Sequence, residues 1–465
     1  MRPHPATMAE EALNRDSMSI LQKLESRFAR FAGHLPIVRI GGHYLLKNGM
    51  RVGPVASREG LFFRVHGSFF KNPPIYFDDS GQGYSAPGWR CEAYDIVEPI
   101  LSGKPAPAEM TGVGLLPDHQ LERLILAGNI AASAAIEPGQ IQPASLDLRL
   151  GSWAVRLRAS FLAGHGKTVE ERLCDFAMHR MDLSEGAVLE KGCVYLVPLQ
   201  EHVKLPAGIQ GLANAKSSTG RLDLLTRLVT DDGTEFDRLP EGYAGPLYAE
   251  ICPRSFSVLV RPGMKLNQLR LRMGEARLDD AALTRLHNKS PLVDGEPIIG
   301  GGLGFSVDLQ GEGVIGWRAR PHSGVIDLEK IGAYPARAFW DPLEAENGRI
   351  ILDPGAFYIL KSREAVAIPA DHAAEMSPYL ALAGEFRVHY AGFFDPGFGI
   401  GRYGQGARGV LEVRCHEAPF VLEHGQCVGR LVYERMASKP NRLYGATIAS
   451  NYQGQGLKLA KQFCE

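Results

Sequence analysis

The sequence predicts a mainly β protein in which two similar domains follow a small N-terminal β module. Three observations lead to this prediction. Short runs rich in β-branched and aromatic residues alternate with Pro and Gly, long segments recur at a constant spacing, and a linker rich in Pro and Gly follows residue 100. The chain has 465 residues, of which 45% are hydrophobic and 22% charged, so two or three globular domains are expected.

The N-terminal part divides into two predicted segments. Residues 1–34 are expected to form a polar tail with a short amphipathic helix, and residues 35–110 a small β module with its linker. Lys47-Asn48-Gly49 is typical of a hairpin turn between strands. The module carries no chemical motif. Its ends "KNGMRV" and "YDIVEPI" resemble small β modules of phage-encoded proteins, and this resemblance implies an attachment or partner role.

A helix is expected directly after the linker. Asp118 is its predicted N-cap and Gly128 its predicted end, because these residue types are favoured at the two positions.

An internal repeat organises the rest of the chain. The segment "GCVYLVPLQEHVKLPA" at 192–207 matches "GAFYILKSREAVAIPA" at 355–370, 163 positions later. A second match, between 250–263 and 412–425, keeps this offset to within one residue. The sequence therefore predicts two all-β domains, which we call the first repeat (111–275) and the second repeat (276–465).

Charge and cysteine content exclude several classes of function. The net charge is −1 and the pI about 6.9, so neither nucleic acid nor an anionic membrane is an expected partner. The seven cysteines are scattered and never spaced C-x-x-C, which favours reduced thiols in the cytoplasm over a zinc cluster. No apolar run approaches the ~20 residues of a transmembrane helix.

The first repeat contains a candidate anion site, "GLANAKSSTGR" at 211–221. It is not a Walker P-loop, because Ala215 replaces the second glycine and Gly211 lies one residue too close to Lys216. What remains is a cluster of two serine hydroxyls and two cations within six residues, which suits a phosphate group. The corresponding "SPYLALAG" of the second repeat has neither cation.

The second repeat carries a different motif, "HYAGFFDPGFG", in which Pro396 and Gly397 suit the central positions of a type II turn. A glutamate follows an apolar run in each repeat, Glu250 in the first and Glu412 in the second. The chemically suggestive residues are thus divided between the repeats.

Four segments in this order, "QIQPASLDLRLG", "KSSTGR", "AGFFDPGF…GVLE" and "SNYQGQG", resemble the dCTP deaminases of the dUTPase-like trimeric superfamily, in their long duplicated form. The resemblance implies two tandem distorted β-barrel or jelly-roll domains in a homotrimer with sites between subunits. It also implies zinc-independent hydrolysis of dCTP to dUTP and ammonia, feeding dUMP and dTTP synthesis. Mg²⁺ would lie on the substrate triphosphate and not on the protein.

The resemblance also assigns residues. Glu412 matches the catalytic glutamate, assisted by Arg221 and Ser217, while Glu250 is the second candidate. Lys216 stands where the family usually has arginine. The residues matched to substrate binding are Lys216, Ser218, Ala391, Gly392, Asp395, Tyr452, Gln453 and Gln455. A working site would then form where the phosphate half of the first repeat meets the base half of the second.

The residues themselves favour a metal-free mechanism. Zinc deaminases carry H-x-E and P-C-x-x-C, and neither motif occurs in this chain. A buried carboxylate would then move the protons, because burial raises its pKa toward neutrality. A dUTP diphosphohydrolase or dUMP-forming deaminase, and a non-catalytic nucleotide-binding regulator, are the open alternatives. The acting glutamate, the oligomeric state and feedback by dTTP also stay open.

Overall fold

The structure is a computed structural model that describes residues 112–311, 313–378, 392–400, 406–445 and 456–464, apart from the side chains of Pro138 and Pro378. It also describes the backbone of the eight strands from His43 to Ile100 and of Phe386–His389. The chain forms two compact units, residues 1–108 with 132–138 and residues 109–131 with 139–465. The second unit holds the second repeat and all of the first repeat except residues 132–138, and the predicted helix within residues 1–34 lies outside the described residues.

The first unit consists of short strands in two sheets with the orders β2-β1-β8 and β3-β4-β5-β6-β7. Strands β1 and β2 are antiparallel with Leu45 opposite Arg51, which confirms the hairpin predicted around Asn48. The strands are β1 (His43–Leu46), β2 (Arg51–Val52), β3 (Val55–Arg58), β4 (Leu61–Arg64), β5 (Tyr76–Phe77), β6 (Gly83–Ala86), β7 (Trp89–Arg90) and β8 (Ile96–Ile100).

The first repeat folds into two antiparallel sheets. One has the order β13-β12-β15-β19-β17 and the other β11-β21-β16-β18, with β9 paired to β21. Their strands are β9 (Gly114–Leu115), β11 (Leu146–Arg149), β12 (Trp153–Leu157), β13 (Ala177–Asp182), β15 (Val194–Lys204), β16 (Ile209–Ala215), β17 (Leu224–Thr230), β18 (Arg238–Leu239), β19 (Ala244–Pro253) and β21 (Lys265–Met273).

The second repeat has the same arrangement, with sheets β26-β23-β28-β32-β30 and β22-β34-β29-β31. Their strands are β22 (Leu303–Ser306), β23 (Gly316–Ala319), β26 (Trp340–Leu343), β28 (Phe357–Val366), β29 (His372–Pro378), β30 (Phe386–His389), β31 (Phe393–Phe394), β32 (Ala407–Cys415) and β34 (Cys427–Arg435). Tyr195 pairs with Ile251 in the first repeat as Tyr358 pairs with Val413 in the second, so the ladders share their register.

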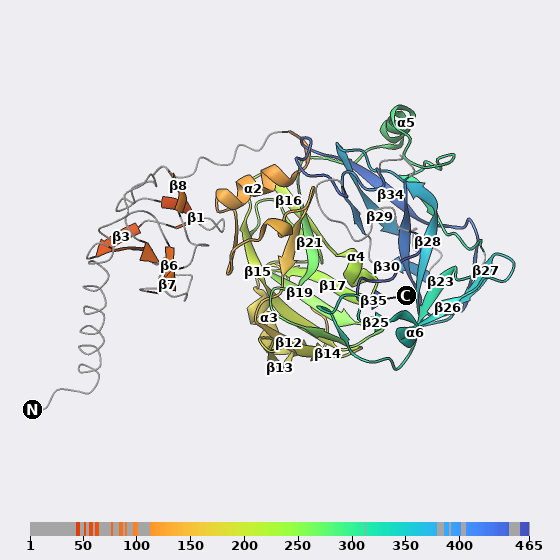
Figure 1. The fold of residues 1–465 in the computed structure, drawn as a ribbon, viewed down its shortest axis with the longest axis horizontal. Helices are drawn as coiled ribbons and strands as arrows, with labels where there is room; N and C mark the ends of the chain where they lie inside the picture. The colour runs from red at the N-terminus through yellow and green to blue at the C-terminus, as the bar shows by residue number, and fades with distance from the viewer. Residues whose placement is uncertain are drawn as a thin grey trace, which may run out of the picture. The chain divides into compact units, whose positions relative to one another are not determined.

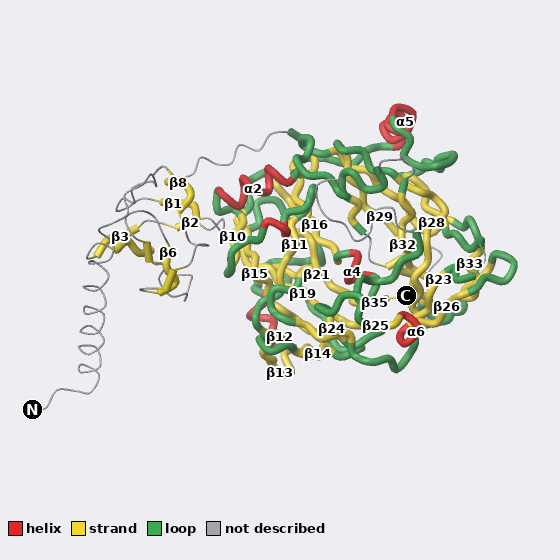
Figure 2. Tube along the Cα trace, in the orientation of Figure 1, coloured by secondary structure: helices red, strands yellow, loops and turns green. Residues whose placement is uncertain are grey.

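Short elements complete the second unit, in which strands and loops predominate (Figure 2). The short strands are β10 (Ile130–Ala132), β14 (Ala187–Leu189), β20 (Val258–Val260), β24 (Ile326–Asp327), β25 (Tyr334–Pro335), β27 (Arg349–Leu352), β33 (Phe420–Glu423) and β35 (Phe463–Cys464). The helices are α2 (Asp118–Leu126), η2 (Pro138–Gln140), α3 (Val169–Phe176), α4 (Ser217–Gly220), α5 (Asp280–Lys289) and α6 (Ala336–Phe339). Among the described residues, no helix is long and apolar enough to cross a membrane.

Helix α2 corrects one detail of the sequence analysis. Its N-cap is Pro117 and not Asp118, which is the first helical residue. The Asp118 carboxylate instead accepts hydrogen bonds from the backbone N–H groups of Asn441 and Arg442, at 2.9 and 3.0 Å. Gly128 ends the helix as predicted, with a φ of +75° and its N–H donated to the Ile125 carbonyl.

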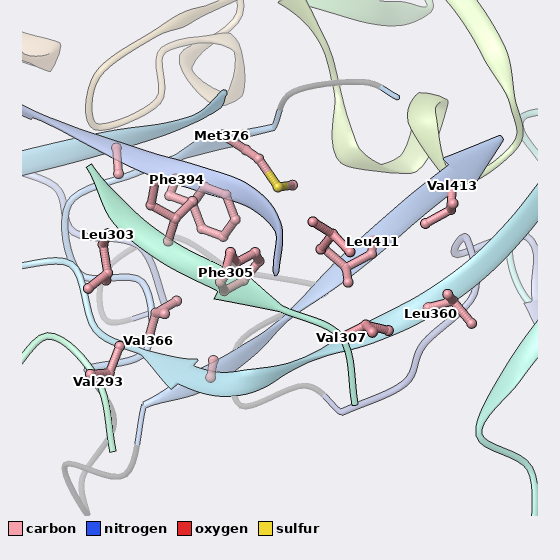
Figure 3. Close-up of a cluster of buried hydrophobic side chains, with 14 of the residues drawn as sticks. Val293, Leu303, Phe305, Val307, Leu360, Val366, Met376, Phe394, Leu411 and Val413 are labelled. Carbon is pink, nitrogen blue, oxygen red and sulfur yellow. The ribbon is translucent and has the colours of Figure 1, made fainter. Parts of the chain in front are cut away.

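Each repeat has its own cluster of buried apolar side chains, and Figure 3 shows that of the second repeat. In Figure 3, Leu411 and Val413 of β32 are among the side chains of this cluster, with Phe305 and Leu360 from β22 and β28. Side chains alternate along a strand, so Glu412 projects from the opposite face of β32. That face is where the site is built.

The chain end is held against both repeats by aromatic rings. The Phe463 ring lies 5.5 Å from that of Phe339 and 5.8 Å from that of Trp340, and both of these pack on Phe256 of the first repeat. Strand β35 adds a parallel pairing with β25. Residues 456–464 are therefore part of the packed unit.

Candidate active site

The predicted anion loop forms the one-turn helix α4, which lies in the middle of the second unit in Figure 1. Lys216 has an extended backbone just before the helix, and its carbonyl accepts the N–H groups of Thr219 and Gly220. The Thr219 hydroxyl donates to the Leu266 carbonyl of β21 at 3.1 Å. These bonds fix the loop while Ser217 and Ser218 stay half-buried, and among the described residues neither hydroxyl has a hydrogen-bond partner.

Glu412 lies on the central part of β32 and is only 5% exposed. Burial raises the pKa of Glu412 to about 8, and the positive charge of Arg221 acts in the opposite direction. Arg221 ends α4 and belongs to the first repeat. The structure therefore brings the predicted phosphate half and the predicted catalytic glutamate together within one chain.

The chain end also reaches this point. Arg221 is 3% exposed, and its Nη1 donates to the Lys458 carbonyl at 3.0 Å. Residues 456–464 are anchored beyond it, where Gln462 donates to the Leu328 carbonyl at 3.0 Å. The C-terminal segment thus helps to hold the Arg221 guanidinium beside β32.

The "DPGF" segment adopts the predicted type II turn. The Phe398 N–H donates to the Asp395 carbonyl at 3.0 Å, and Gly397 has a φ of +94°. The Asp395 carboxylate accepts from Nη2 of Arg270 at 3.0 Å, and the Arg270 guanidinium lies 4.0 Å from the centre of the Phe393 ring. Arg270 belongs to the first repeat, so that repeat holds the turn of the second in place.

Lys216, the cation that the resemblance aligns with an arginine, has a specific partner. Lys216 forms a salt bridge with Asp147 of β11. Burial and the nearby Lys216 charge lower the pKa of Lys461, while Asp147 opposes this shift. Two lysines therefore lie near one carboxylate at α4, an arrangement that suits a polyanion.

Glu250 occupies the equivalent place in the first repeat, but its surroundings differ. On β17 the residue opposite Glu250 is Arg227, and its guanidinium forms a salt bridge with the Glu250 carboxylate. That guanidinium also lies 3.6 Å from the centre of the Phe236 ring. Glu250 is therefore neutralised within its own repeat, whereas the residue opposite Glu412 on β30 is His389.

In its described residues the second repeat differs from the first at the position of Asp147. Strand β22 corresponds to β11 of the first repeat. The residue of β22 at the position of Asp147 is Gly304. A Cβ at Gly304 would come within 3.2 Å of Arg430 and closer still to Ile298, so a carboxylate there would need both to shift. The segment that corresponds to α4 includes residues 379–385, which lie outside the described residues.

The structure thus brings six of the predicted site residues to one region, namely Lys216, Ser217, Ser218 and Arg221 at α4 with Asp395 and Glu412. Gly392 precedes β31, where its carbonyl accepts the Met376 N–H. Four predicted residues lie outside the described part of the chain, namely Ala391, Tyr452, Gln453 and Gln455. Across the described ranges no group of three or more His, Cys, Asp or Glu side chains could hold a metal ion, and the six described cysteines are free thiols.

Sequence reasoning missed three residues of this region: Asp147, Arg270 and Lys461. Asp147 lies within the motif "QIQPASLDLRLG", and the replacement of arginine by Lys216 was the signal that could have pointed to a carboxylate partner. Arg270 gave no local signal, because its partners lie more than a hundred positions away in the second repeat.

Comparisons with known proteins match the two parts of the chain to two domains of one family. Residues 112–275 match the family described as the 2'-deoxycytidine 5'-triphosphate deaminase N-terminal domain, and residues 279–463 match the corresponding C-terminal domain. A crystal structure of 2'-deoxycytidine 5'-triphosphate deaminase from Agrobacterium tumefaciens is 52% identical, with a TM-score of 0.68. That match covers 70% of this chain and 99% of the other.

Curated relatives match a shorter stretch. The dUMP-forming dCTP deaminase of Nanoarchaeum equitans is 30% identical over 178 residues, which are 34% of this chain and 83% of the relative. The dCTP deaminase of Natronomonas pharaonis is 26% identical over 158 residues, which are 33% and 78%. Each match has about the length of one repeat.

The fold and the comparisons define a mainly β enzyme built from two similar repeats, with the candidate site at their junction. The chain belongs to the 2'-deoxycytidine 5'-triphosphate deaminase family, and it is an enzyme of that type.

The two glutamates should respond oppositely to removal of their charge. The pKa of Glu412 is raised from 4.5 to about 8, so between these pH values the folded chain keeps a proton that the unfolded chain has released. Its stabilising contribution is complete below pH 4.5 and is lost as the pH rises through 8. Glu412→Gln should therefore raise the Tm relative to wild type, by more at pH 8 than at pH 5.

Glu250→Gln is the matched control, and it should lower stability by about 1–3 kcal/mol because it leaves the Arg227 guanidinium without its carboxylate. Thermal unfolding at several pH values measures both effects. A Glu412→Gln variant that is less stable than wild type at pH 8 would contradict the assignment of a buried, neutral carboxyl.

Proposed function

We propose that this chain hydrolyses dCTP to dUTP and ammonia at the junction of its two repeats. The observation that carries the proposal is the proximity of a buried Glu412 carboxyl, with its raised pKa, to the Arg221 guanidinium of the other repeat. A carboxyl whose pKa lies near neutrality can take up and release protons in the working pH range.

The triphosphate would be bound at α4. Lys216 and Lys461 supply positive charge there, and the Ser217 and Ser218 hydroxyls can donate to phosphate oxygens. Mg²⁺ would enter with the nucleotide, held by phosphate oxygens as part of the substrate. The closing role of Tyr452, Gln453 and Gln455 stays a prediction.

The cytosine ring would lie beside β32 and the turn that contains Asp395. The Glu412 carboxylate takes a proton from water as the hydroxide attacks C4, and it passes that proton to N3 of the ring. A second proton transfer lets ammonia leave, which forms the C4 carbonyl of uracil. Arg221 and Ser217 would orient the water and the ring, and hydrogen bonds that strengthen as charge develops would lower the barrier.

The product needs its own test, because some relatives are dUMP-forming deaminases, such as those of Nanoarchaeum equitans and Corynebacterium glutamicum. The non-catalytic alternative is set aside, because the chain is an enzyme of this family.

With dCTP and Mg²⁺, the purified protein should release ammonia and dUTP in equal amounts. Pyrophosphate with dUMP would instead identify the bifunctional reaction.

Glu412→Gln should lower kcat by about 10²–10⁴-fold, because it removes the proton carrier while keeping the shape of the side chain. Binding of dCTP, measured by calorimetry, should persist. Glu250→Gln should change kcat less than threefold if assayed at a temperature where the variant is folded. A larger loss from Glu250→Gln than from Glu412→Gln would reverse the assignment.

The pH dependence follows from the same carboxyl. The ionised form accepts the proton from water, so kcat/KM should rise with pH to a plateau above about 8, the pKa of Glu412. Steady-state kinetics from pH 6 to 9.5 measure this acidic limb. A kcat/KM that falls steadily over this range would contradict a carboxylate base.

A further inference from the structure

A second buried ion pair joins the repeats beside the proposed catalytic pair. Asp223 follows Arg221 by two residues, and Arg414 follows Glu412 by two residues on β32. The Arg414 Nη2 donates to the Asp223 carboxylate. The side chains of Arg414 and Asp223 are only 7% and 0% exposed, so this contact is shielded from solvent.

Ser255 completes the network. Its hydroxyl donates to Oδ2 of Asp223 at 2.6 Å and accepts from Nη2 of Arg414 at 3.2 Å. Arg414 also donates through Nη1 to the Gly355 carbonyl of its own repeat. One guanidinium thus holds a loop of the second repeat and a carboxylate of the first at the same time.

The backbone shows that Asp223 is held tightly. Its φ of +53° lies in the left-handed region, which non-glycine residues seldom adopt. The Asp223 N–H donates to the Gly220 carbonyl of α4 at 2.8 Å, and its carbonyl accepts the Arg254 N–H at 3.0 Å. A displacement of the Asp223 carboxylate would therefore move the end of α4, including Arg221.

We propose that Asp223, Ser255 and Arg414 are positioning residues for the deamination, which hold α4 against β32 so that the Arg221 guanidinium stays beside Glu412. Arg414 and Glu412 share one face of the strand, because side chains alternate along it. The ion pair thus fixes the junction two residues along β32 from Glu412. This inference rests on the proposed function.

The network is specific to the glutamate of the second repeat. In the first repeat Cys252 follows Glu250 by two residues, so Arg414 has no counterpart beside that glutamate. In the other buried pair at the junction, that of Arg270 with Asp395, the first repeat supplies the arginine and the second repeat supplies the carboxylate. The two pairs thus have their arginines on different repeats. Together they specify one docking geometry, because an arrangement with the repeats exchanged would leave these charges unpaired.

The test is the double variant Asp223→Asn with Arg414→Gln. Removing both charges together avoids the uncompensated buried charge that either single substitution would leave. We expect kcat to fall at least tenfold and KM to change less than threefold. The acidic limb of kcat/KM should move to higher pH, because Arg221 lowers the pKa of Glu412 and its displacement removes that effect. The substitutions leave the net charge unchanged.

The matched control is Arg261→Gln. It breaks a different ion pair between the repeats, that of Arg261 with Asp327 at 2.8 Å, which has no atom on α4 or β32. This variant should keep the wild-type kcat and pH profile. Ser255→Ala serves if the double variant does not fold, since it keeps both charges and removes only the bridging hydroxyl. For Ser255→Ala we expect a severalfold lower kcat and an acidic limb of kcat/KM that is also moved to higher pH.

The outcomes separate this inference from the proposed function. If wild type releases no ammonia from dCTP, the proposed function fails first. If wild type is active and Glu412→Gln is not, while the folded double variant or Ser255→Ala keeps the wild-type kcat and pH profile, the positioning role is overturned. A loss shared equally by Arg261→Gln would overturn it too, because that result reports only loosened repeats.

Discussion

The interaction on which the rest of the structure depends is the electrostatic one between the buried Glu412 carboxyl and the Arg221 guanidinium. A carboxyl in such surroundings favours its neutral form, and a nearby cation is what keeps its pKa within reach of working pH. The two groups come from different repeats, so the proposed catalysis requires a fixed junction between them. Buried ion pairs, with Arg270 and Arg414 as the cations, occupy that junction.

The two repeats share sheet order and register, yet their candidate site residues differ. In the first repeat Arg227 neutralises the glutamate that corresponds to Glu412, and in the second Gly304 takes the place of Asp147. A buried charge without a partner is costly, so a duplicated site that no longer binds substrate is expected to lose or pair its charges. We therefore infer one working site per chain.

Much of this could be predicted from sequence, because the informative residues lie in short contiguous motifs. The α4 loop, the "DPGF" turn and the strand that carries Glu412 each have a local signature in turn or strand residues. The partners across the junction do not. Asp223 pairs with Arg414 across 191 positions, and no local pattern encodes such a contact. Asp118 is a second example, because a residue type that is typical of N-caps accepts a hydrogen bond from the distant Asn441 instead.

The most direct test of the account is complementation between two inactive chains. Arg221→Gln and Glu412→Gln chains, carrying different tags, would be co-expressed, and assemblies containing both would be isolated through both tags. If each site forms within a single chain, these assemblies should be as inactive toward dCTP as either variant alone. Wild type co-isolated with the Glu412→Gln chain should keep activity in proportion to its content. Recovery of a quarter or more of wild-type ammonia release by the mixed variants would contradict the account, because it would place the two halves on different chains.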